Sequence, residues 1–513
     1  MTRNSDQPRL ARGFLAVWLS GMLLLLCGVG SRAVAASGGR VASRPNFLIV
    51  LCDDLGYGDL RCYGNSKIVS PHVDRFAREG VKLTSCYAAA ANCSPARAGL
   101  LTGRTPYRMG IYNWIPELSP MHLKQREITI ATILQRSGYA TAHIGKWHLN
   151  GSLSFTNQPQ PSDHGFDYWF STQNVALPTH HNPDNFVRNG KTVGKLHGYS
   201  AELVADESIR WLKEKRDKTK PFFLFVCFHE PHEPIATDHR FTALYPNTGR
   251  RSPFDPDVSG LAAHHGNITQ MDDGFGRIMK AIDRLELRKN TFVLFTSDNG
   301  PAITHWHPYG SAGPLREKKG HLYDGGIRVP GIIRWPGHTR PGSVSDEPIC
   351  GVDLLPTLCG ITGRPIPADR KIDGADIRPI FHNKPIRRTT PLYWQFDVAR
   401  SRPKVAMRIG DWMVLADLTG PKIKPFGDIR AGDMKIIKTA ELKSFELYNL
   451  KKDIGERTDM AQREPKRLAE MSARLRILYH EVRDEGPIWP AWKWPHLAGN
   501  RINAFIKSLR KKK

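Results

Sequence analysis

A short stretch from Asn92 to Arg104 holds residues whose types and spacing could perform chemistry. Cys93 is followed by a proline two residues later and by Arg97 two residues after that. Pro95 suits the first turn of a helix, where its missing N–H would have no partner in any case. Gly103 suits the end of that helix. The stretch therefore predicts a cysteine at a helix N-terminus, where the partial positive charge favours anions. A cysteine taken alone is more often a buried thiol or half of a disulfide.

Two pairs of oxygen-bearing side chains follow apolar runs elsewhere in the chain. Asp53 and Asp54 end one run, and Asp298 and Asn299 end another. Such hard oxygen donors bind Ca²⁺ or Mg²⁺ in preference to zinc or copper. Each pair alone is weak evidence, because Asp-Gly and Asn-Gly are common in turns.

The two neighbouring aspartates can serve one site only if the strand ends between them, since successive strand side chains point to opposite faces. We expect Gly56 and Gly58 to supply that break. The same two glycines could suggest a dinucleotide-binding loop. Arg61 stands where the third glycine of that motif would be, which excludes it.

The order of these motifs resembles the type I sulfatases, the formylglycine-dependent arylsulfatase family of the alkaline phosphatase superfamily. In that family the cysteine of Cys-x-Pro-x-Arg is oxidised after translation to formylglycine, and one calcium ion is held nearby. Ala96 stands where the family often has serine, a minor departure because the recognition core is intact. The resemblance implies that the Ca²⁺ ligands are Asp53, Asp54, Asp298, Asn299 and modified Cys93.

Two further segments match the family. The Gly-Lys-Trp-His segment implies Lys146 as a ligand of sulfate and His148 as the partner of a hydroxyl of the hydrated aldehyde. Counting back from the acidic residue before two glycines implies Lys319, not Lys318, as a second sulfate ligand. The family usually has glutamate where this chain has Asp324.

A His-x-x-His pair at His229 and His232 could suggest a zinc site. Pro231 and Pro234 forbid the regular helix that such a pair needs. In the sulfatases a histidine at the exit of this strand contacts the bridging ester oxygen. His232 is the better match, and His229 remains the alternative.

The resemblance implies hydrolysis of sulfate esters. One hydroxyl of hydrated formylglycine, activated by Ca²⁺, would attack sulfur, while the motif arginine and the two lysines neutralise the sulfate charge. His232 would serve the leaving alkoxide as general acid. The remaining hydroxyl would lose its proton to His148 or Asp53. The catalytic residues expected are therefore Cys93, Arg97, Lys146, His148, His232 and Lys319.

The elements that must position these residues alternate between strands and helices. Apolar runs at 46–52, 222–226 and 291–296 are typical of strands buried on both faces, and amphipathic helices are expected at 201–215 and 274–287. This alternation predicts an α/β fold with a large, mostly parallel central sheet flanked by helices, whose ligands gather at the carboxyl ends of the strands. The resemblance implies the alkaline-phosphatase-like version of that fold.

The character of the sequence changes from about Pro379 onward. Short strand patterns precede a charged helix at about 465–484, which predicts a smaller C-terminal domain with an antiparallel sheet and a helix. Three tryptophans near the end are expected to pack back on the surface, with a platform for a sugar ring as the alternative: Trp489, Trp492 and Trp494. The expected organisation is a signal peptide at 1–35, a catalytic domain at 36–380 and a C-terminal α+β domain with a basic tail at 381–513.

The chain has 513 residues and a formal net charge of +25, which favours polyanionic partners. It shows neither zinc-finger spacing nor an aromatic RNA-binding pattern, so nucleic acid is not the expected partner. Sulfated carbohydrate is the expected substrate class, and a formylglycine-generating or equivalent maturation enzyme is the second expected partner. A basic, merely solvated surface is the alternative.

The N-terminus predicts export. Three arginines within the first twelve residues precede an apolar run at 14–29 and a small-x-small site at 33–35, as in a signal peptide. The apolar run is short for a membrane span, and no stable span is expected. The protein would be periplasmic or secreted, or lysosomal in an animal; a signal kept as an anchor is the alternative.

Three questions stay open at the level of sequence. Pairing cannot be assigned among Cys52, Cys62, Cys86, Cys227, Cys350 and Cys359. A phosphonate monoester or phosphodiester hydrolase could share the same site, and so could a polyanion-binding protein that retains the site without turnover. The natural ester and the oligomeric state are not specified.

Overall fold

Strand β1 (Asn46–Asp53) lies in the middle of a ten-stranded sheet and is buried over its whole length. Its side chains alternate between two apolar cores, beginning with Phe47 in one and Leu48 in the other. Parallel strands β8 (Phe222–Pro231) and β9 (Thr291–Ser297) flank it. The three apolar runs predicted as buried strands are therefore three adjacent strands of the sheet. The computed structural model describes residues 44–154, 157–424 and 427–511.

The central part of the sheet is parallel, as predicted. In the order β11-β2-β10-β9-β1-β8-β4-β5-β6-β7, the run from β9 to β5 is parallel and antiparallel pairs occur towards both edges. Parallel strands bring their carboxyl ends to one edge, where ligands usually bind. The other strands are β2 (Val81–Leu83), β4 (Ala140–Lys146), β5 (Tyr168–Thr172), β6 (Val187–Arg188), β7 (Lys191–Thr192), β10 (Gly331–Arg334) and β11 (Ser343–Ser345).

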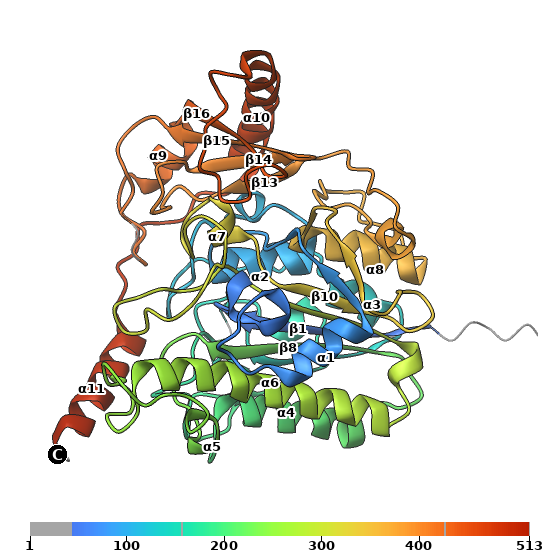
Figure 1. Cartoon of the computed structure of the whole chain (residues 1–513), viewed down its shortest axis with the longest axis vertical. Helices are drawn as coiled ribbons and strands as arrows, with labels where there is room; N and C mark the ends of the chain where they lie inside the picture. Colours follow the sequence, from blue (N-terminus) through green and yellow to red (C-terminus); the bar gives the residue numbers. More distant parts are fainter. Residues whose placement is uncertain (1–43, 155–156, 425–426, 512–513) are drawn as a thin grey trace, which may run out of the picture. The chain divides into compact units, whose positions relative to one another are not determined.

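Helices cover both faces of the sheet (Figure 1). The core on one face includes residues of α1 (Pro71–Glu79), α4 (Ser200–Arg210) and α6 (Gly260–Arg284). The core on the other face includes residues of α2 (Cys93–Thr102), α3 (Ile130–Arg136) and α8 (Leu354–Thr362). This arrangement confirms the predicted α/β class.

Helix α6 is longer than the expected helix at 274–287. It begins at Gly260, after Ser259 caps it by accepting a hydrogen bond from the N–H of Ala262. Its first turns contain His264, His265 and neighbouring polar residues, which weaken the apolar period. These residues are nevertheless buried, so tertiary packing decides the helix start.

A four-stranded antiparallel sheet follows, as predicted. Its strands are β13 (Leu392–Gln395), β14 (Val405–Ile409), β15 (Trp412–Leu418) and β16 (Leu442–Asn449), and α10 (Pro465–Glu485) comes after them. Residues 44–513 form one compact unit, so the boundary near 380 stays a prediction.

Residues Leu497–Lys511 form helix α11, which the sequence analysis did not expect, and the basic tail at the end of the chain stays a prediction. Ile502 and Ile506, one helical turn apart, pack with Phe254 and Ile235. The sequence pattern holds this apolar spacing, but the lysines and arginines of the segment obscure it. Figure 1 shows α11 close to one end of α6.

The predicted signal peptide at 1–35 lies outside the described residues. Among residues 44–511 as described, no helix combines the length and the apolar character that crossing a bilayer requires. The seven cysteines of the described residues are all unpaired. The pairing left open by the sequence is thus answered for those six that lie outside the motif: none forms a disulfide.

A buried arginine joins helix α10 to the region after α2. The side chain of Arg108 is 1% exposed and contacts Asp373 at 3.0 Å. Glu481 and Glu485 of α10 contact the same guanidinium at 2.9 Å and 2.8 Å. Removing one partner of a buried ion pair leaves an uncompensated charge, which is strongly destabilising.

We therefore expect Arg108→Ala to lower the free energy of unfolding by about 3–5 kcal/mol, because Asp373 would stay buried without a cation. Denaturant titration followed by tryptophan fluorescence measures this change. Arg75→Ala is the control: that side chain is 65% exposed, and its removal should change stability by no more than about 0.5 kcal/mol. Equal stability of the two variants would show that Arg108 does not hold these elements together.

Candidate active site

Helix α2 places Cys93 at the carboxyl edge of the sheet. Cys93 is the first residue of the helix, and the side chain of Asn92 accepts a hydrogen bond from its backbone N–H at 2.9 Å. The helix ends at Gly103, whose φ is 69°. The predicted helix start and glycine stop are both present, so the local sequence places Cys93 at the first position of the helix.

The thiol of Cys93 lies between the carboxylate of Asp53 and the ammonium group of Lys319. Its Sγ donates towards Asp53 Oδ1 at 3.5 Å, and Lys319 Nζ donates to Sγ at 3.3 Å. Burial raises the pKa of the Cys93 thiol well above its ordinary value, and Lys146 and Lys319 only partly oppose this effect.

The two aspartates after β1 reach the same site for a reason that differs from the expected one. The strand ends at Asp53, and Asp54 itself adopts a left-handed backbone with a φ of 67°. This conformation costs a non-glycine residue about 1–3 kcal/mol. Gly56 and Gly58 do not make the break. They allow a close approach of the loop around Ser311, whose carbonyl would lie 2.2 Å from a Cβ on Gly56.

Three buried ion pairs cross the centre of the site. Each joins a carboxylate expected to bind metal to a cation expected to bind sulfate. The pairs are Arg97–Asp298 at 2.7 Å, Lys146–Asp53 at 2.7 Å and Lys319–Asp54 at 2.6 Å. The six formal charges cancel, so the site is neutral before any ligand binds.

The cations determine the ionisation of the two neighbouring aspartates. Burial favours the neutral acids, but at Asp53 the surrounding cations, Lys146 first among them, together outweigh it and hold the pKa of that carboxyl well below its usual range. The cations around Asp54, with Lys319 first, likewise lower the pKa of that carboxyl. Both side chains are therefore carboxylates at neutral pH.

Oxygen atoms without partners indicate where a cation fits. Asp54 Oδ2 and Asn299 Oδ1 are buried and accept no hydrogen bond, while Asn299 Nδ2 donates to Asp54 Oδ1 at 2.7 Å. Buried polar atoms normally have a partner. Ligand atoms of Asp53, Asp54, Cys93 and His232 lie within 4.8 Å of one another. This donor set fits a hard divalent cation such as Ca²⁺.

A glycine allows Lys146 to reach the site. Gly145, the preceding residue of β4, has a φ of 108°, and a Cβ there would lie 1.8 Å from the carbonyl oxygen of Cys227 on β8. Only glycine accommodates this close approach. The side chain of Lys146 is fully buried, and its ammonium faces Asp53.

The structure distinguishes between the two candidate histidines. His232 lines the cavity described below, and its Nε2 lies 3.6 Å from Asp54 Oδ2. His229 is fully buried on β8, and its Nε2 contacts Thr172 Oγ1 at 2.8 Å. His232 is therefore the histidine that faces the other site residues.

His148 also lines the cavity, with its Nε2 3.1 Å from the carbonyl oxygen of Ile115 and its Nδ1 buried without a partner. Because a carbonyl only accepts, Nε2 carries the hydrogen and Nδ1 is a free acceptor. Burial lowers the pKa of the imidazole far below its usual range, and nearby Lys146 lowers it further.

The two adjacent lysines are separated in space. Lys319 contacts Cys93 and Asp54 as described, whereas Lys318 Nζ donates to the carbonyl oxygen of Ile303 at 3.1 Å. The geometry agrees with the choice of Lys319 for the reacting group. Both lysines lie in the wall of the cavity.

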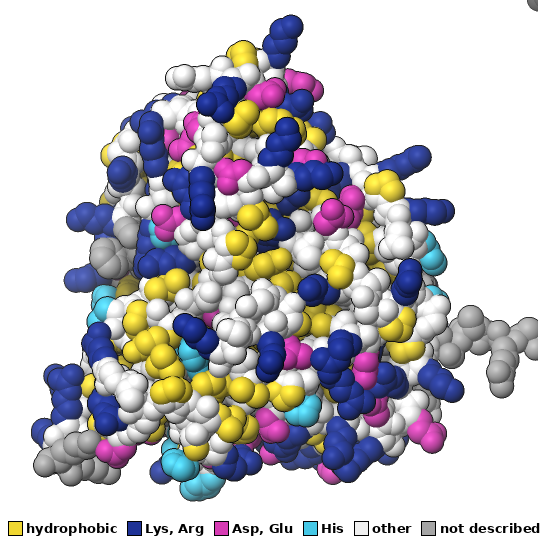
Figure 2. All heavy atoms as spheres, in the orientation of Figure 1, with side chains coloured by type: hydrophobic (Ala, Val, Ile, Leu, Met, Phe, Trp, Pro, Cys, Tyr) yellow, Lys and Arg dark blue, Asp and Glu magenta, His cyan; other side chains and the backbone are white. Residues whose placement is uncertain are grey.

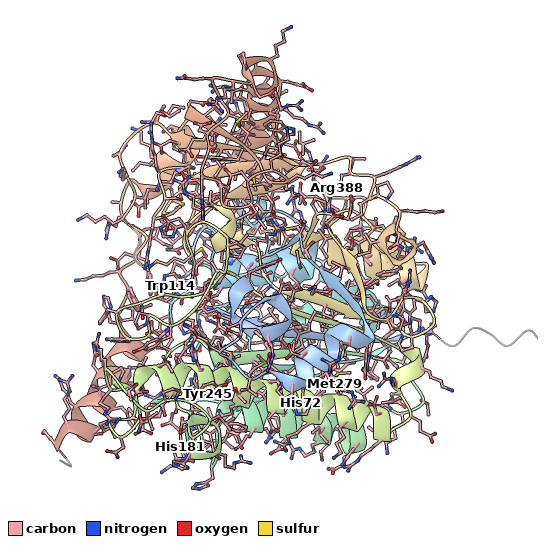
Figure 3. All side chains as sticks on the ribbon, viewed as in Figure 1. His72, Trp114, His181, Tyr245, Met279 and Arg388 are labelled. Carbon is pink, nitrogen blue, oxygen red and sulfur yellow. The ribbon has the colours of Figure 1, made fainter. Side chains whose placement is uncertain are left out.

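A cavity of about 400 Å³ opens above Cys93. Tryptophans from three distant segments line it: Trp114, Trp306 and Trp494. Trp114, labelled in Figure 3, lies towards α11 and meets Trp494 edge-on at 4.9 Å. Of the three C-terminal tryptophans only Trp494 lines the cavity; Trp489 is buried, and its Nε1 donates to the carbonyl oxygen of Gly110 at 2.7 Å.

Sequence reasoning missed most of the cavity wall. Residues without a local motif line it, among them Glu117, Glu233, Phe396, Arg400 and the first turns of α11. Of the residues at 305–309, Trp306 alone lines the cavity, while His307 is buried and stacks on His264 at 5.6 Å. No signal in the chain marked Arg400, whereas the apolar spacing in α11 could have been found.

Comparison with known proteins places this site in a family. The sulfatase family model matches residues 45–364. The steryl-sulfatase of Mus musculus is 34% identical over 436 residues, which cover 71% of this chain and 69% of that protein. The N-acetylgalactosamine-6-sulfatase of Mus musculus is 31% identical over 383 residues, covering 70% of this chain and 69% of that protein. A protein crystallised in complex with k-i-k-neocarrahexaose shares the fold, with a TM-score of 0.73 at 23% identity over 92% of this chain and 99% of that chain.

Proposed function

Given that this chain belongs to the sulfatase family and is a sulfuric ester hydrolase, we propose that it cleaves sulfate esters of carbohydrates. The proposed nucleophile is a formylglycine made from Cys93, and the proposed cofactor is one Ca²⁺ ion. One observation carries the proposal. Three carboxylates and three cations are paired around Cys93, and two buried oxygens beside them have no partner. This arrangement offers a place for one divalent cation and for one anionic group.

The modified residue and the ion supply the nucleophile. Hydrated formylglycine carries two hydroxyls, one to attack sulfur and one whose deprotonation releases the product. Bound Ca²⁺ lowers the pKa of a coordinated hydroxyl. The residues that would hold the ion are Asp53, Asp54, Asp298, Asn299 and residue 93.

Arg97, Lys146 and Lys319 would bind the sulfate oxygens. Their carboxylate partners hold them in place before substrate arrives, so little reorganisation is needed during the reaction. Preorganised charge of this kind is usually the largest contribution to rate enhancement. Arg97 is the most constrained, because it also donates to the carbonyl oxygen of Lys146 at 2.9 Å.

His232 would give a proton to the leaving oxygen. Its Nδ1 lies against the carbonyl oxygen of Glu233, which can only accept, so Nδ1 holds a hydrogen and Nε2 is the atom that faces the site. Burial lowers the pKa of His232, although Asp54 opposes this effect. A lowered pKa favours release of the proton once the imidazole is charged. His148 Nδ1, a buried free acceptor, is suited to take a proton from the second hydroxyl.

The cavity wall and the surface charge support a carbohydrate substrate. Trp114, Trp306 and Trp494 line the cavity together with polar side chains such as Asn174 and Thr304, a combination that suits a sugar ring. Lys and Arg side chains are spread over the face shown in Figure 2, consistent with a polyanionic partner. One of the relatives is named a steryl-sulfatase, so a sterol sulfate ester is the competing substrate.

Two further parts of the proposal concern the maturation and the location of the protein. A formylglycine-generating or equivalent enzyme must modify Cys93, and we propose export to the periplasm or the exterior.

A phosphonate monoester or phosphodiester hydrolase would differ by turning over aryl phosphonate faster than aryl sulfate. A polyanion-binding protein that only retains the site would show no turnover after complete modification.

The nucleophile can be tested by mass spectrometry. Peptides of the active protein that contain residue 93 should be lighter than the cysteine form when residue 93 is the aldehyde. Cys93→Ala should lack both the modification and the activity while retaining the fold. Fully active protein with only unmodified Cys93 would contradict the mechanism.

The metal can be tested through Asn299, whose removal leaves all three ion pairs intact. We expect Asn299→Ala to lower kcat on an aryl sulfate by about 10- to 100-fold, and to lower the Ca²⁺ retained after dialysis, as measured by elemental analysis. Asp298→Ala should be more severe, since it also leaves Arg97 without its partner. Asp206→Ala, at a 60% exposed aspartate of α4, is the control. Normal Ca²⁺ content and kcat in Asn299→Ala would refute the ligand set.

The carbohydrate assignment can be tested at Trp494. We expect Trp494→Ala to lower kcat/KM on a sulfated oligosaccharide by about 3- to 10-fold through loss of ring contact, and on 4-nitrophenyl sulfate by less than about 2-fold. Trp494→Phe should restore most of the loss. Faster wild-type turnover of a steroid sulfate than of every sulfated saccharide in a panel would assign the cavity to sterols instead.

A further inference from the structure

Two cations in the cavity wall are not used by the proposed mechanism. Lys318 and Arg400 both line the cavity. Within the described part of the chain neither forms an ion pair, unlike Lys319, whose ammonium is 2.6 Å from Asp54. Unpaired cations are ordinary on an open surface, where water solvates them. Their position in the catalytic cavity is what requires an explanation.

The chain holds both cations close to the loop that carries Lys319. Arg400 donates its backbone N–H to the carbonyl oxygen of Gly320 at 2.7 Å, and its side-chain stem crosses Gly320, with Cδ 3.7 Å from the place of a Cβ there. Lys319, the residue before Gly320, donates to the Sγ of Cys93. Lys318 is fixed against the carbonyl oxygen of Ile303. Lys318 therefore belongs to the loop that carries Lys319, and Arg400 packs against that loop.

Their remaining hydrogen-bond donors are suited to an oxyanion. The Arg400 guanidinium has five N–H donors in a planar fork that matches sulfate or carboxylate in a bidentate manner. Lys318 keeps two ammonium hydrogens after its contact with Ile303. The apolar side chains of Phe396, Val398 and Ile303 line the same cavity, while Arg400 itself is exposed and accessible to a ligand.

Acidic groups in the cavity wall restrict where a second anion can bind. The carboxyl groups of Glu117 and Glu233 also line the cavity, and either would repel a second anion placed beside it. The reacting sulfate already occupies the cations around Cys93 in the proposed mechanism. Lys318 and Arg400 are the cations of the cavity wall that remain for another anionic group.

We propose that Lys318 and Arg400 form a second anion-binding subsite, which selects sulfated saccharides that carry another sulfate or a carboxylate near the ester that is cleaved. This inference rests on the proposed function and specifies its substrate class. The reacting ester binds at Cys93, and the second oxyanion binds at Lys318 and Arg400 in the wall of the same cavity.

The test compares substrates that differ in one anion. N-acetylglucosamine 6-sulfate carries one sulfate, and glucosamine 2-N,6-O-disulfate carries two on the same ring. A 6-sulfated disaccharide containing a uronate supplies the carboxylate arm. Each is assayed for sulfate release and as a competitor of 4-nitrophenyl sulfate hydrolysis, so that a sugar that binds without being cleaved still gives a result.

We expect wild-type protein to favour at least one doubly anionic saccharide over the monosulfate by about 10-fold in kcat/KM or inhibition constant. Arg400→Gln should remove most of this preference, Lys318→Gln should remove part of it, and both should change kcat/KM on 4-nitrophenyl sulfate by less than about 2-fold. Arg402→Gln, at an exposed arginine two residues away that lies outside the cavity wall, is the matched control.

The outcomes separate this inference from the proposed function. Absence of a wild-type preference, or equal losses on singly and doubly anionic compounds in Arg400→Gln, would overturn the second subsite while leaving the hydrolase intact. Failure of correctly modified protein to release sulfate from any compound would overturn the proposed function itself. Preference for the uronate or for the disulfate identifies which oxyanion the subsite binds.

Discussion

The buried ion pair between Arg97 and Asp298 is the interaction on which the rest of the site depends. Arg97 belongs to helix α2 and Asp298 follows strand β9, so the pair fixes the helix that carries Cys93 against the edge of the sheet. The same guanidinium binds the carbonyl oxygen of Lys146 at the end of β4. Because a buried charge without its partner costs several kcal/mol, neither residue can change alone, and long-range electrostatics fix the helix start that carries Cys93 in its place.

Charge balance explains how so many ionised groups coexist without solvent. The three acid–cation pairs sum to zero, and two buried oxygens remain beside them. A site of this kind can accept a divalent cation and an anion together more readily than either alone, since each ligand compensates the charge brought by the other. The strained backbone at Asp54 turns a second carboxylate towards the site. In a regular strand this side chain would point to the opposite face from Asp53.

Chemistry and selectivity come from different parts of the chain. The proposed reacting groups lie at the ends of β1, β4, β8 and β9, at the start of α2 and, for Lys319, in a loop after β9. All are within the segment that matches the sulfatase family model. Much of the cavity wall comes from later residues, including Phe396, Arg400, Trp494 and the first turns of α11. Changes in these later segments can therefore alter which ester enters without disturbing the charge balance at Cys93.

The sequence by itself determined the features that depend on neighbouring residues. Continuous apolar runs predicted the three central strands, a proline and a glycine predicted the limits of the helix that carries Cys93, and ordered motifs predicted the residues that meet at the sheet edge. Tertiary structure alone decided the left-handed turn at Asp54, the separation of Lys318 from Lys319, and the arrival of Arg400 and Trp494 in one cavity. Periodicity and capping act over a few residues and leave a local pattern. A cavity wall is built by packing between segments hundreds of residues apart, and no pattern within any one segment records that contact.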